Sequence, residues 1–167
     1  MIISLTGFMG CGKSSVGKAL AEMSGCDFVD LDTYIITRAQ KSISELFEGG
    51  EAVFRDFEAE CLRQVIGESV ANGKNTVLAL GGGSLLDSDS RKLVLESTRC
   101  VYLKTSLEAI RSRLGDTAAE RPLFCSENLD RLYHYRIPIY RQAHLTVETD
   151  GLDVCAVASV IASKLSL

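Results

Sequence analysis

Near its start the chain reads Gly7-Phe8-Met9-Gly10-Cys11-Gly12-Lys13-Ser14, which fits the pattern G-x-x-x-x-G-K-[ST]. A short apolar run, Ile2–Thr6, precedes this stretch, and Lys13–Met23 follows it with the spacing of an amphipathic helix. Glycines permit the backbone turns that point successive N–H groups at phosphate oxygens, and the helix adds a partial positive charge at its N-terminus. A glycine-rich turn without a ligand does not need this strand–loop–helix context. The stretch therefore predicts a nucleotide-binding phosphate loop.

The side chains of this loop have separate expected roles. We expect Lys13 to reach the β- and γ-phosphates, and the Ser14 hydroxyl to coordinate Mg²⁺. A switch GTPase shares such a loop, but this chain has no N-K-x-D sequence for reading guanine. The residues expected to contact the nucleotide here are Gly10, Cys11, Gly12, Lys13, Ser14 and Ser15.

Strand-like and helix-like segments alternate around this loop. The expected strands are Ile2–Thr6, Asp27–Asp30, Thr76–Leu80, Cys100–Leu103 and Leu145–Thr149. The expected helices are Lys13–Met23, Thr33–Gln40, Ser42–Phe47, Ala52–Ile66, Asp89–Leu95, Thr105 to about Leu114, Leu129–Gln142 and a last one around Val154–Leu165. Two of them open with capping-box patterns, at Ser42–Glu45 and Thr105–Glu108. The alternation predicts an α/β fold with a parallel sheet and helices on both faces.

Length and composition limit the class of protein. With 167 residues, 46% of them hydrophobic, the chain fits one domain, 1–167, with one core. A net charge of −4 and a pI of about 5.2 argue against a nucleic-acid partner, which normally meets a basic face. The first apolar run lacks a basic n-region, and no stretch approaches ~20 apolar residues, so we expect a cytoplasmic protein without a membrane partner. The six scattered cysteines form no C-x-x-C pair, which indicates reduced thiols.

Two carboxylates, Asp30 and Asp32, follow the second expected strand. If that segment stays extended, alternation points both side chains the same way. One can then help to place Mg²⁺ while the other accepts the proton of a hydroxyl nucleophile. The alternative is that Asp32 merely caps the next helix.

Three glycines, Gly81, Gly82 and Gly83, end the third expected strand. Ligands of parallel α/β sheets bind beyond the C-terminal ends of the strands. Glycines at such a place favour a close approach of something to the backbone, although a flexible turn has the same composition.

Arginines supply the isolated cations. Arg55 lies near the expected start of a helix, where its guanidinium can bind a carboxylate with two hydrogen bonds or pair with Glu51 or Glu58. Arg121 stands beside a proline in a polar loop at about 115–125, whose length is typical of an active-site lid. Arg141 follows another proline and indicates nothing by itself.

Together these segments resemble the shikimate kinases over nearly the whole chain, from Ile2 to about Val147. Each motif after the first is weak alone, but their order and spacing are specific. They are the phosphate loop Gly7–Ser14, Asp30-x-Asp32, Phe47–Arg55, Leu80-Gly81-Gly82-Gly83, Arg121-Pro122-Leu123 and Pro138-Ile139-Tyr140-Arg141.

The resemblance implies a reaction in which ATP and shikimate give ADP and shikimate 3-phosphate, on the way to aromatic amino acids. It also implies a five-stranded parallel sheet with a substrate-binding segment at about 33–66 and a mobile lid at about 115–125. We expect the protein to act as a monomer with shikimate, ATP and Mg²⁺.

The same resemblance implies the role of each site residue. Lys13, Asp32 and Arg121 are the expected catalytic residues, with Asp32 on the reacting hydroxyl and Arg121 on phosphate. Asp30 joins Ser14 at Mg²⁺, and Arg113 lies beside adenine. The expected acceptor-binding residues are Asp32, Arg55, Gly81, Gly82, Gly83 and Arg141, with the two arginines on the carboxylate. Two arginines suit an anionic acceptor, because a neutral sugar would leave two desolvated charges unpaired.

Two other functions remain open at this point. A different small-molecule kinase of the same fold, such as a gluconate kinase, also has an acceptor with a carboxylate. A nucleotide-binding protein that signals or scaffolds without catalysis would keep the phosphate loop, although it would be expected to have lost one of Lys13, Ser14, Asp30, Asp32 or Arg121.

Overall fold

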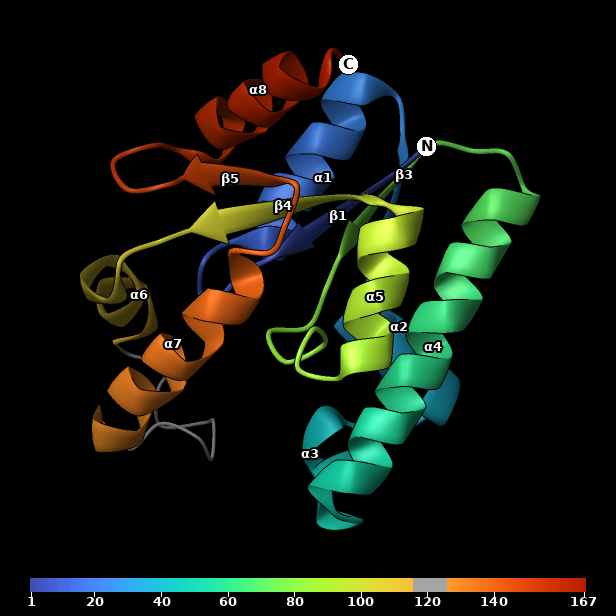
Figure 1. Ribbon diagram of the computed structural model, residues 1–167, viewed down its shortest axis with the longest axis vertical. Helices are drawn as coiled ribbons and strands as arrows, with labels where there is room; N and C mark the ends of the chain where they lie inside the picture. The colour runs from blue at the N-terminus through green and yellow to red at the C-terminus, as the bar shows by residue number, and fades with distance from the viewer. Residues whose placement is uncertain (116–125) are drawn as a thin grey trace.

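The computed structural model describes residues 1–115 and 126–167 of the chain. Its centre is a parallel sheet of five strands in the order β2-β3-β1-β4-β5 (Figure 1). The strands are β1 (Ile2–Thr6), β2 (Asp27–Asp30), β3 (Thr76–Ala79), β4 (Arg99–Lys104) and β5 (Leu145–Glu148). The predicted five-stranded parallel sheet is confirmed, and each strand lies within one residue of its expected bounds.

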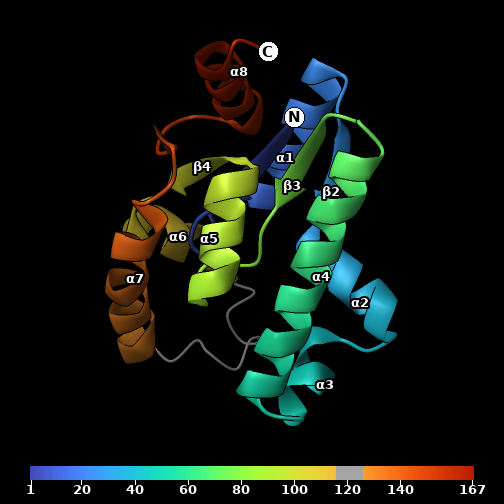
Figure 2. The same cartoon turned by 45° about the vertical axis from the view of Figure 1, so that its right-hand side comes forward.

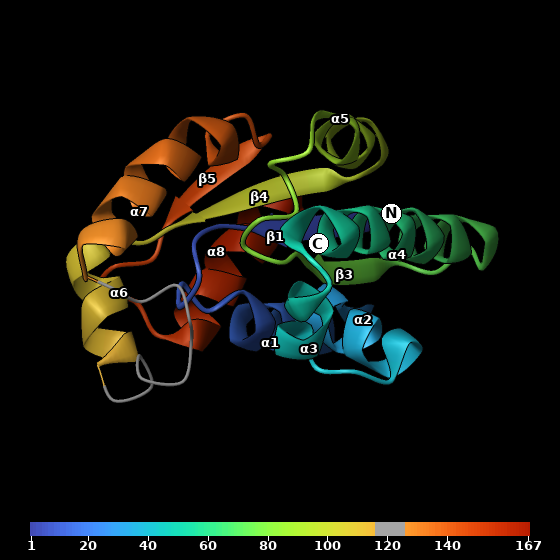
Figure 3. The same ribbon diagram turned by 90° about the horizontal axis from the view of Figure 1, so that it is seen from below.

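Helices cover both faces of the sheet (Figure 3). On one face lie α1 (Lys13–Ser24) and α8 (Val154–Leu165), and on the other lie α4 (Glu51–Ala71) and α5 (Ser88–Ser97). The remaining helices are α2 (Leu31–Ala39), α3 (Ile43–Glu48), α6 (Leu107–Leu114) and α7 (Ser126–Tyr140). No helix in the two described stretches is long and apolar enough to cross a membrane.

The central strand β1 divides the core into two layers. Ile3 and Leu5 are fully buried in the cluster that includes α1 and α8, whereas Ile2 belongs to the cluster formed with α4 and α5. Both sides of β1 are therefore apolar, as expected of a strand that is covered on both faces. Ser4 and Thr6 are the polar residues of this strand, and the Ser4 hydroxyl bonds the Thr98 hydroxyl at 2.7 Å.

The register of the sheet brings the functional segments to one edge. In β1, Leu5 lies opposite Ala79 of β3 and Val101 of β4, and Asp30 of β2 lies opposite the same Ala79. The phosphate loop, the Asp30–Asp32 turn and the glycine triplet therefore leave three adjacent strands at nearly the same level. This is the edge at which ligands of parallel α/β sheets bind.

The turn after β2 differs from the prediction. Asp32 lies in the first turn of α2 and not in an extended segment. Asp30 is the residue that caps this helix, since its backbone stays extended (φ −100°, ψ 118°) and its Oδ1 accepts a hydrogen bond from Thr33 N at 3.1 Å. An N-cap needs an extended backbone one residue before the helix, and Asp30 meets this condition at the end of its strand.

One of the two predicted capping boxes is present. At α3 the Ser42 side chain accepts from Glu45 N, and the Glu45 carboxylate accepts from Ser42 N at 2.7 Å. The expectation for α6 is wrong, because Ser106 and not Thr105 is the N-cap. The Thr105 hydroxyl instead bonds the Thr149 hydroxyl at 2.6 Å, a contact across the sheet that no local pattern encodes.

The segment at about 33–66 corresponds to most of α2, all of α3 and much of α4. These helices pack against one another beside the sheet, with α3 next to the N-terminal end of α4 and α2 next to its middle (Figure 2). The Arg38 guanidinium on α2 pairs with Glu60 on α4 at 2.6 Å, which ties the two helices together. A role of this segment in substrate binding stays a prediction.

Candidate active site

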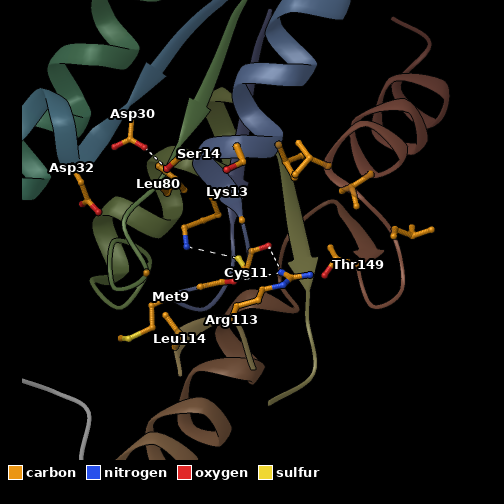
Figure 4. Close-up of a pocket in the computed structure, with 18 of the residues that line it drawn as sticks. Met9, Cys11, Lys13, Ser14, Asp30, Asp32, Leu80, Arg113, Leu114 and Thr149 are labelled. Atoms are coloured by element: carbon orange, nitrogen blue, oxygen red, sulfur yellow. Dashed lines mark hydrogen bonds between the residues drawn. The ribbon is translucent and has the colours of Figure 1, made fainter. Parts of the chain in front are cut away.

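A cleft with a volume of about 620 Å³ opens at the carboxyl ends of the strands. Figure 4 shows its side chains, with Asp30 and Asp32 on one side of Lys13 and with Arg113 and Thr149 on the other. Its remaining lining comes mostly from the phosphate loop, from Leu80 and Gly82 after β3, and from the segment that joins β5 to α8. The cleft therefore spans the sheet, with different elements at its two ends.

The phosphate loop forms the floor of this cleft. Gly10 and Gly12 have φ values of 79° and 94°, in the left-handed region that favours glycine. Lys13 Nζ donates to the carbonyl oxygens of Gly7 at 2.9 Å and Phe8 at 3.1 Å, so its charge is held at the loop. The loop thus combines the backbone turns and the cation that a polyphosphate needs.

Ser14 and Asp30 meet beside this loop. The Ser14 hydroxyl donates to Asp30 Oδ2, while Asp30 Oδ1 accepts from Thr33 N. A hydroxyl and a carboxylate at the phosphate end of a cleft are the hard oxygen ligands that Mg²⁺ prefers. The donor set therefore fits this ion, and the structure brings the two predicted metal residues together.

Arg113 lies at the opposite end of the cleft. Its Nη1 is 3.4 Å from the carbonyl oxygens of Gly10 and Cys11, so α6 reaches over the phosphate loop. Facing it, the apolar side chains of Leu152 and Val154 line the cleft while staying 40% exposed. A cation on one wall and aliphatic surface on the other suit a flat heteroaromatic ring.

A pair of contacts fixes the distance between these two walls. Ser106 N, at the start of α6, donates to Asp150 Oδ1 at 3.0 Å, and Thr105 bonds Thr149 as described above. The hydrogen bonds from Ser106 lower the pKa of Asp150, so its carboxylate is charged at neutral pH. The loop after β5 and the helix α6 are thereby joined directly.

The glycine triplet lies among polar side chains. A Cβ atom at Gly81 would lie 2.7 Å from Glu58 Oε1, 2.9 Å from Ser84 Oγ and 3.0 Å from Asp32 Oδ1. A Cβ at Gly83 would overlap the Arg55 guanidinium. A side chain at either glycine would therefore displace these groups, so the close approach predicted for the triplet is made here by the protein's own side chains, and a ligand at the triplet stays a prediction.

Arg55 makes both of the pairings that its sequence neighbours suggested. Its Nη1 lies 2.7 Å from Glu58 Oε2, and its Nη2 lies 3.5 Å from Glu51. The guanidinium also stacks near the rings of Phe47 and Phe54, at 5.8 and 5.1 Å from their centres. Glu58 is only 3% exposed, so Arg55 is anchored by a buried carboxylate on the inner side of α4.

A second arginine, Arg136 on α7, reaches the same triplet. It is 4% exposed, its Nη1 donates to Gly82 O at 3.2 Å, and its guanidinium lies 5.8 Å from the Phe8 ring centre. Its Nε has no hydrogen-bond partner among the described residues, and no carboxylate there pairs with it. The Tyr140 hydroxyl donates to the same Gly82 oxygen at 2.5 Å, and burial raises the pKa of Tyr140. A buried guanidinium without a carboxylate partner among residues 1–115 and 126–167 makes this a position where a bound anion would be favourable.

Comparison with known proteins accounts for this arrangement. The sequence profile described as shikimate kinase matches residues 9–166. The chain belongs to the shikimate kinase family. It is 42% identical to a shikimate kinase of Thermus thermophilus, over 98% of this chain and 89% of that protein. It is 44% identical to the enzyme of Geobacter sulfurreducens, over 96% and 88% of the two chains.

Solved structures of the shikimate kinase family agree with the fold. A shikimate kinase from Acinetobacter baumannii in complex with shikimate has a TM-score of 0.89 and 33% identity, covering 99% of this chain and 93% of that one. The enzyme from Bacteroides thetaiotaomicron gives 0.86 and 31%, with coverage of 100% and 99%. A gluconokinase from Sinorhizobium meliloti, at 0.64 and 23%, shares the fold alone.

Arg141 is the predicted site residue that the structure places elsewhere. It is exposed just after the end of α7 and does not line the cleft. The helix explains the difference: Leu129, Tyr133, Arg136 and Tyr140 follow one another at steps of four, three and four residues and share the buried face of α7. Arg141 lies one residue beyond this face, so the shikimate kinase motif around Pro138 brings Arg136 and not Arg141 to the glycines.

The other predicted residues have definite positions, with one exception. The nucleotide-contact set from Gly10 to Ser15, together with Asp30, Asp32, Gly82 and Arg113, lines the cleft. Gly81, Gly83 and Arg55 are not among the residues that line the cleft, but they lie next to Asp32 and Gly82, which are. Arg121 and the predicted lid, except for its first residue, lie outside the described residues.

Sequence reasoning missed three side chains that lie beside the glycine triplet: Glu58, Ser84 and Arg136. Glu58 had been considered only as a surface partner of Arg55, whereas it is buried. Its position on the inner face of α4, with Phe54, Cys61 and Leu62, was a usable signal. Ser84 left no comparable pattern, because it becomes relevant only when the turn after β3 folds against α4.

Proposed function

We propose that this member of the shikimate kinase family transfers the γ-phosphoryl group of ATP to the 3-hydroxyl of shikimate, in the biosynthesis of aromatic amino acids. The phosphate loop and the Arg113 end of the cleft would hold ATP. The glycine triplet, with Asp32, Arg55 and Arg136 around it, would hold shikimate. The two sites meet near Lys13, where the transferred group passes from one to the other.

The buried guanidinium of Arg136 carries this proposal. A cation that is 4% exposed and has no carboxylate partner among the described residues is costly unless a ligand supplies the negative charge. Shikimate has one carboxylate and several hydroxyls, which matches an arginine pair and a nearby aspartate. We assign the carboxylate to Arg55 and Arg136, in place of the predicted pair Arg55 and Arg141.

The proposed chemistry follows from the placement of these residues. The acceptor hydroxyl oxygen bonds the γ-phosphorus while the bond from that phosphorus to the β–γ bridging oxygen breaks. Asp32 accepts the hydroxyl proton, and Lys13 balances the charge on the β- and γ-phosphates. Ser14 and Asp30 would hold Mg²⁺, which neutralises phosphate charge when bound. We assign Arg121 to the transferred phosphoryl group, as the sequence predicted.

The setting of the enzyme is part of the same proposal. We propose a monomer, since one chain supplies both ends of the cleft. We propose a cytoplasmic location, which is supported by the free thiols of Cys11, Cys26, Cys61, Cys100 and Cys155. The net charge of −4 supports the absence of a nucleic-acid partner.

The decisive experiment measures ADP release from ATP and Mg²⁺ with shikimate, gluconate or no acceptor. Shikimate should raise turnover by orders of magnitude, and the product should carry phosphate on its 3-oxygen by phosphorus and proton magnetic resonance. Faster turnover with gluconate would establish the other small-molecule kinase. Nucleotide binding without acceptor-dependent turnover would establish a non-catalytic protein.

A further inference from the structure

Glu58 is held from two directions. Its Oε2 accepts a hydrogen bond from Arg55 Nη1 at 2.7 Å, three residues earlier on α4. Its Oε1 accepts a hydrogen bond from the Ser84 hydroxyl at 2.6 Å, and Ser84 lies in the turn after β3. Both Glu58 and Ser84 are nearly inaccessible, at 3% and 2% exposure. The two bonds form a continuous chain from the glycine turn to the guanidinium of Arg55.

The two hydrogen bonds of Glu58 constrain its position in different ways. Arg55 and Glu58 lie on the same helix, so the bond between them does not set where the pair lies relative to the sheet. The Ser84 bond does, since the turn that carries Ser84 follows directly from β3, and Ser84 N donates to Gly81 O at 3.2 Å. Ser84 thus supplies the link that places the α4 pair against the glycine triplet.

The packing around Gly81 leaves little tolerance for a loose carboxylate. Glu58 Oε1, Ser84 Oγ and Asp32 Oδ1 would each lie within about 3 Å of a Cβ at Gly81. The carboxylates of Glu58 and Asp32 therefore both lie against Gly81, and their like charges repel. A donor that holds one oxygen of Glu58 opposes this repulsion and keeps Arg55 beside Gly83.

We propose that Ser84 is a positioning residue for the acceptor: through Glu58, its hydroxyl holds Arg55 in the orientation that binds the acceptor carboxylate. The proposal rests on the proposed function, because it names a determinant of the same acceptor site. Ser84 touches neither substrate in this scheme. Its removal should weaken shikimate binding and leave ATP binding unchanged.

The first test is steady-state kinetics of Ser84→Ala with each substrate varied in turn. We expect kcat/KM for shikimate to fall about 10-fold, mostly through KM, because a hydrogen bond to a charged group is lost one step away from the ligand. The KM for ATP should change less than 2-fold. The matched control is Ser69→Ala, which removes a hydroxyl that bonds Val65 O at 2.8 Å on the far part of α4. If Ser84→Ala raised the KM for shikimate and the KM for ATP equally, the proposal would be overturned.

A double-mutant cycle separates positioning from general packing. If Ser84 acts through Arg55, adding Ser84→Ala to Arg55→Ala should cost less than 2-fold more in shikimate affinity, measured by calorimetry. A further 10-fold loss in that background would overturn the proposal. Ser84→Thr, which keeps the hydroxyl, should bind shikimate at least 3-fold more tightly than Ser84→Ala, and equal affinities would contradict the role of the hydroxyl.

The wild-type protein in the same experiments tests the underlying function. If it binds and phosphorylates shikimate while Ser84→Ala behaves like Ser69→Ala, only the role of Ser84 is wrong. If the wild type does not use shikimate, the proposed function itself fails. Circular dichroism at the assay temperature should show that each variant is folded, and a Ser84→Ala protein that is unfolded there would show Ser84 to be a folding determinant instead.

Discussion

Arg136 and Arg141 are five positions apart and have opposite environments, one buried against Gly82 and the other exposed. If Arg136 binds the acceptor carboxylate, its loss removes a charge-assisted contact worth roughly 1.5–3 kcal/mol. Arg136→Ala should therefore lower kcat/KM for shikimate by about 10- to 150-fold, with little change in the KM for ATP. Arg141→Ala is the matched control and should stay within about 2-fold of wild type. If Arg141→Ala lowered kcat/KM for shikimate by clearly more than 2-fold, Arg141 would have to be assigned to the acceptor carboxylate after all.

The same buried charge has a consequence for stability. Arg136 has no carboxylate partner in the described part of the chain, and a guanidinium without one opposes folding in the absence of ligand, a cost that an apolar side chain of similar length removes. Arg136→Met should therefore leave the free energy of unfolding unchanged or raise it by about 1–2 kcal/mol while acceptor binding is lost. Urea unfolding without ligands measures this. Destabilisation by more than about 1 kcal/mol would show that the bond to Gly82 and the Phe8 contact outweigh the desolvation of the charge.

How far the sequence specifies the site depends on the range of the contacts. The positions of Lys13 and Ser14 in the cleft could be predicted because the phosphate loop is contiguous and its shape lies largely in its own backbone. Arg136 could not, because its role depends on how α7 faces the sheet. Ser84 is the extreme case, since its partner Glu58 lies 26 residues away and only the packed structure brings them together.

At the scale of elements, the link between α6 and the loop after β5 sets the geometry of the nucleotide end. Asp150→Ala removes the carboxylate that accepts from Ser106 N, so the two walls of the cleft lose one of their connections. We expect the KM for ATP to rise about 3- to 10-fold, with the KM for shikimate nearly unchanged. Asp150→Asn keeps an acceptor oxygen and should lie between wild type and Asp150→Ala.

The pH dependence of this link has a definite sign. The pKa of Asp150 is lowered by its hydrogen bonds to Ser106, so the stabilising contribution is complete above the ordinary carboxyl pKa and is lost only as pH falls through the lowered value. Between pH 6 and pH 8 the ratio of the KM for ATP of Asp150→Ala to that of wild type should therefore be constant. The control is Glu148→Ala, which breaks an exposed ion pair with Lys104 on the neighbouring strand. If Glu148→Ala and Asp150→Ala raised the KM for ATP equally, the link between α6 and the loop after β5 would not be what sets the geometry of the cleft.

The elements themselves were largely predictable, and the exceptions have physical causes. All five strands could be predicted, because the central ones are continuous apolar runs that are buried along their length, as in β1 and β3, and the outer ones are short segments between helices. The failure at Thr105 arose where a side chain had two possible partners, a helix terminus and Thr149 on the next strand. Asp30 took the cap expected of Asp32 for a similar reason, since the end of β2 fixed its backbone first.

At the scale of the molecule, the order of the strands distributes the two substrates. The strands β2, β3 and β1 are adjacent, and they end in Asp30, the glycine triplet and the phosphate loop. The strands β4 and β5 end in α6 and the loop that holds Asp150, which supply the nucleotide end. In the proposed function, one sheet would thus present the acceptor and the nucleotide side by side, with Lys13 between them, and a rigid sheet would keep the reacting atoms aligned.

The same sheet should make the protein sensitive to alkaline pH. Burial raises the pKa of Cys100 to about 11 and the pKa of Tyr102 to about 12, and both lie on β4 next to the central strand. Because the folded state favours the protonated forms, their contribution to stability is complete below the pKa values of the unfolded chain, 9.0 and 10.0, and is lost as pH rises through the folded values.

Urea unfolding at pH 8, 9, 10 and 11 tests this with Tyr102→Phe, which keeps the ring in the core and removes the ionisable group. The free energy of unfolding of wild type should fall relative to that of Tyr102→Phe above pH 10, by at most about 1.4 kcal/mol per pH unit. For Cys100→Ala the free energy of unfolding should likewise depend less on pH than that of wild type, and this difference should begin one pH unit lower. The exposed thiol of Cys155 provides the control, since Cys155→Ala should follow wild type at every pH. Parallel curves for wild type and Tyr102→Phe from pH 8 to pH 11 would mean that β4 opens to solvent before its side chains ionise, so that the centre of the sheet is not the last part to unfold.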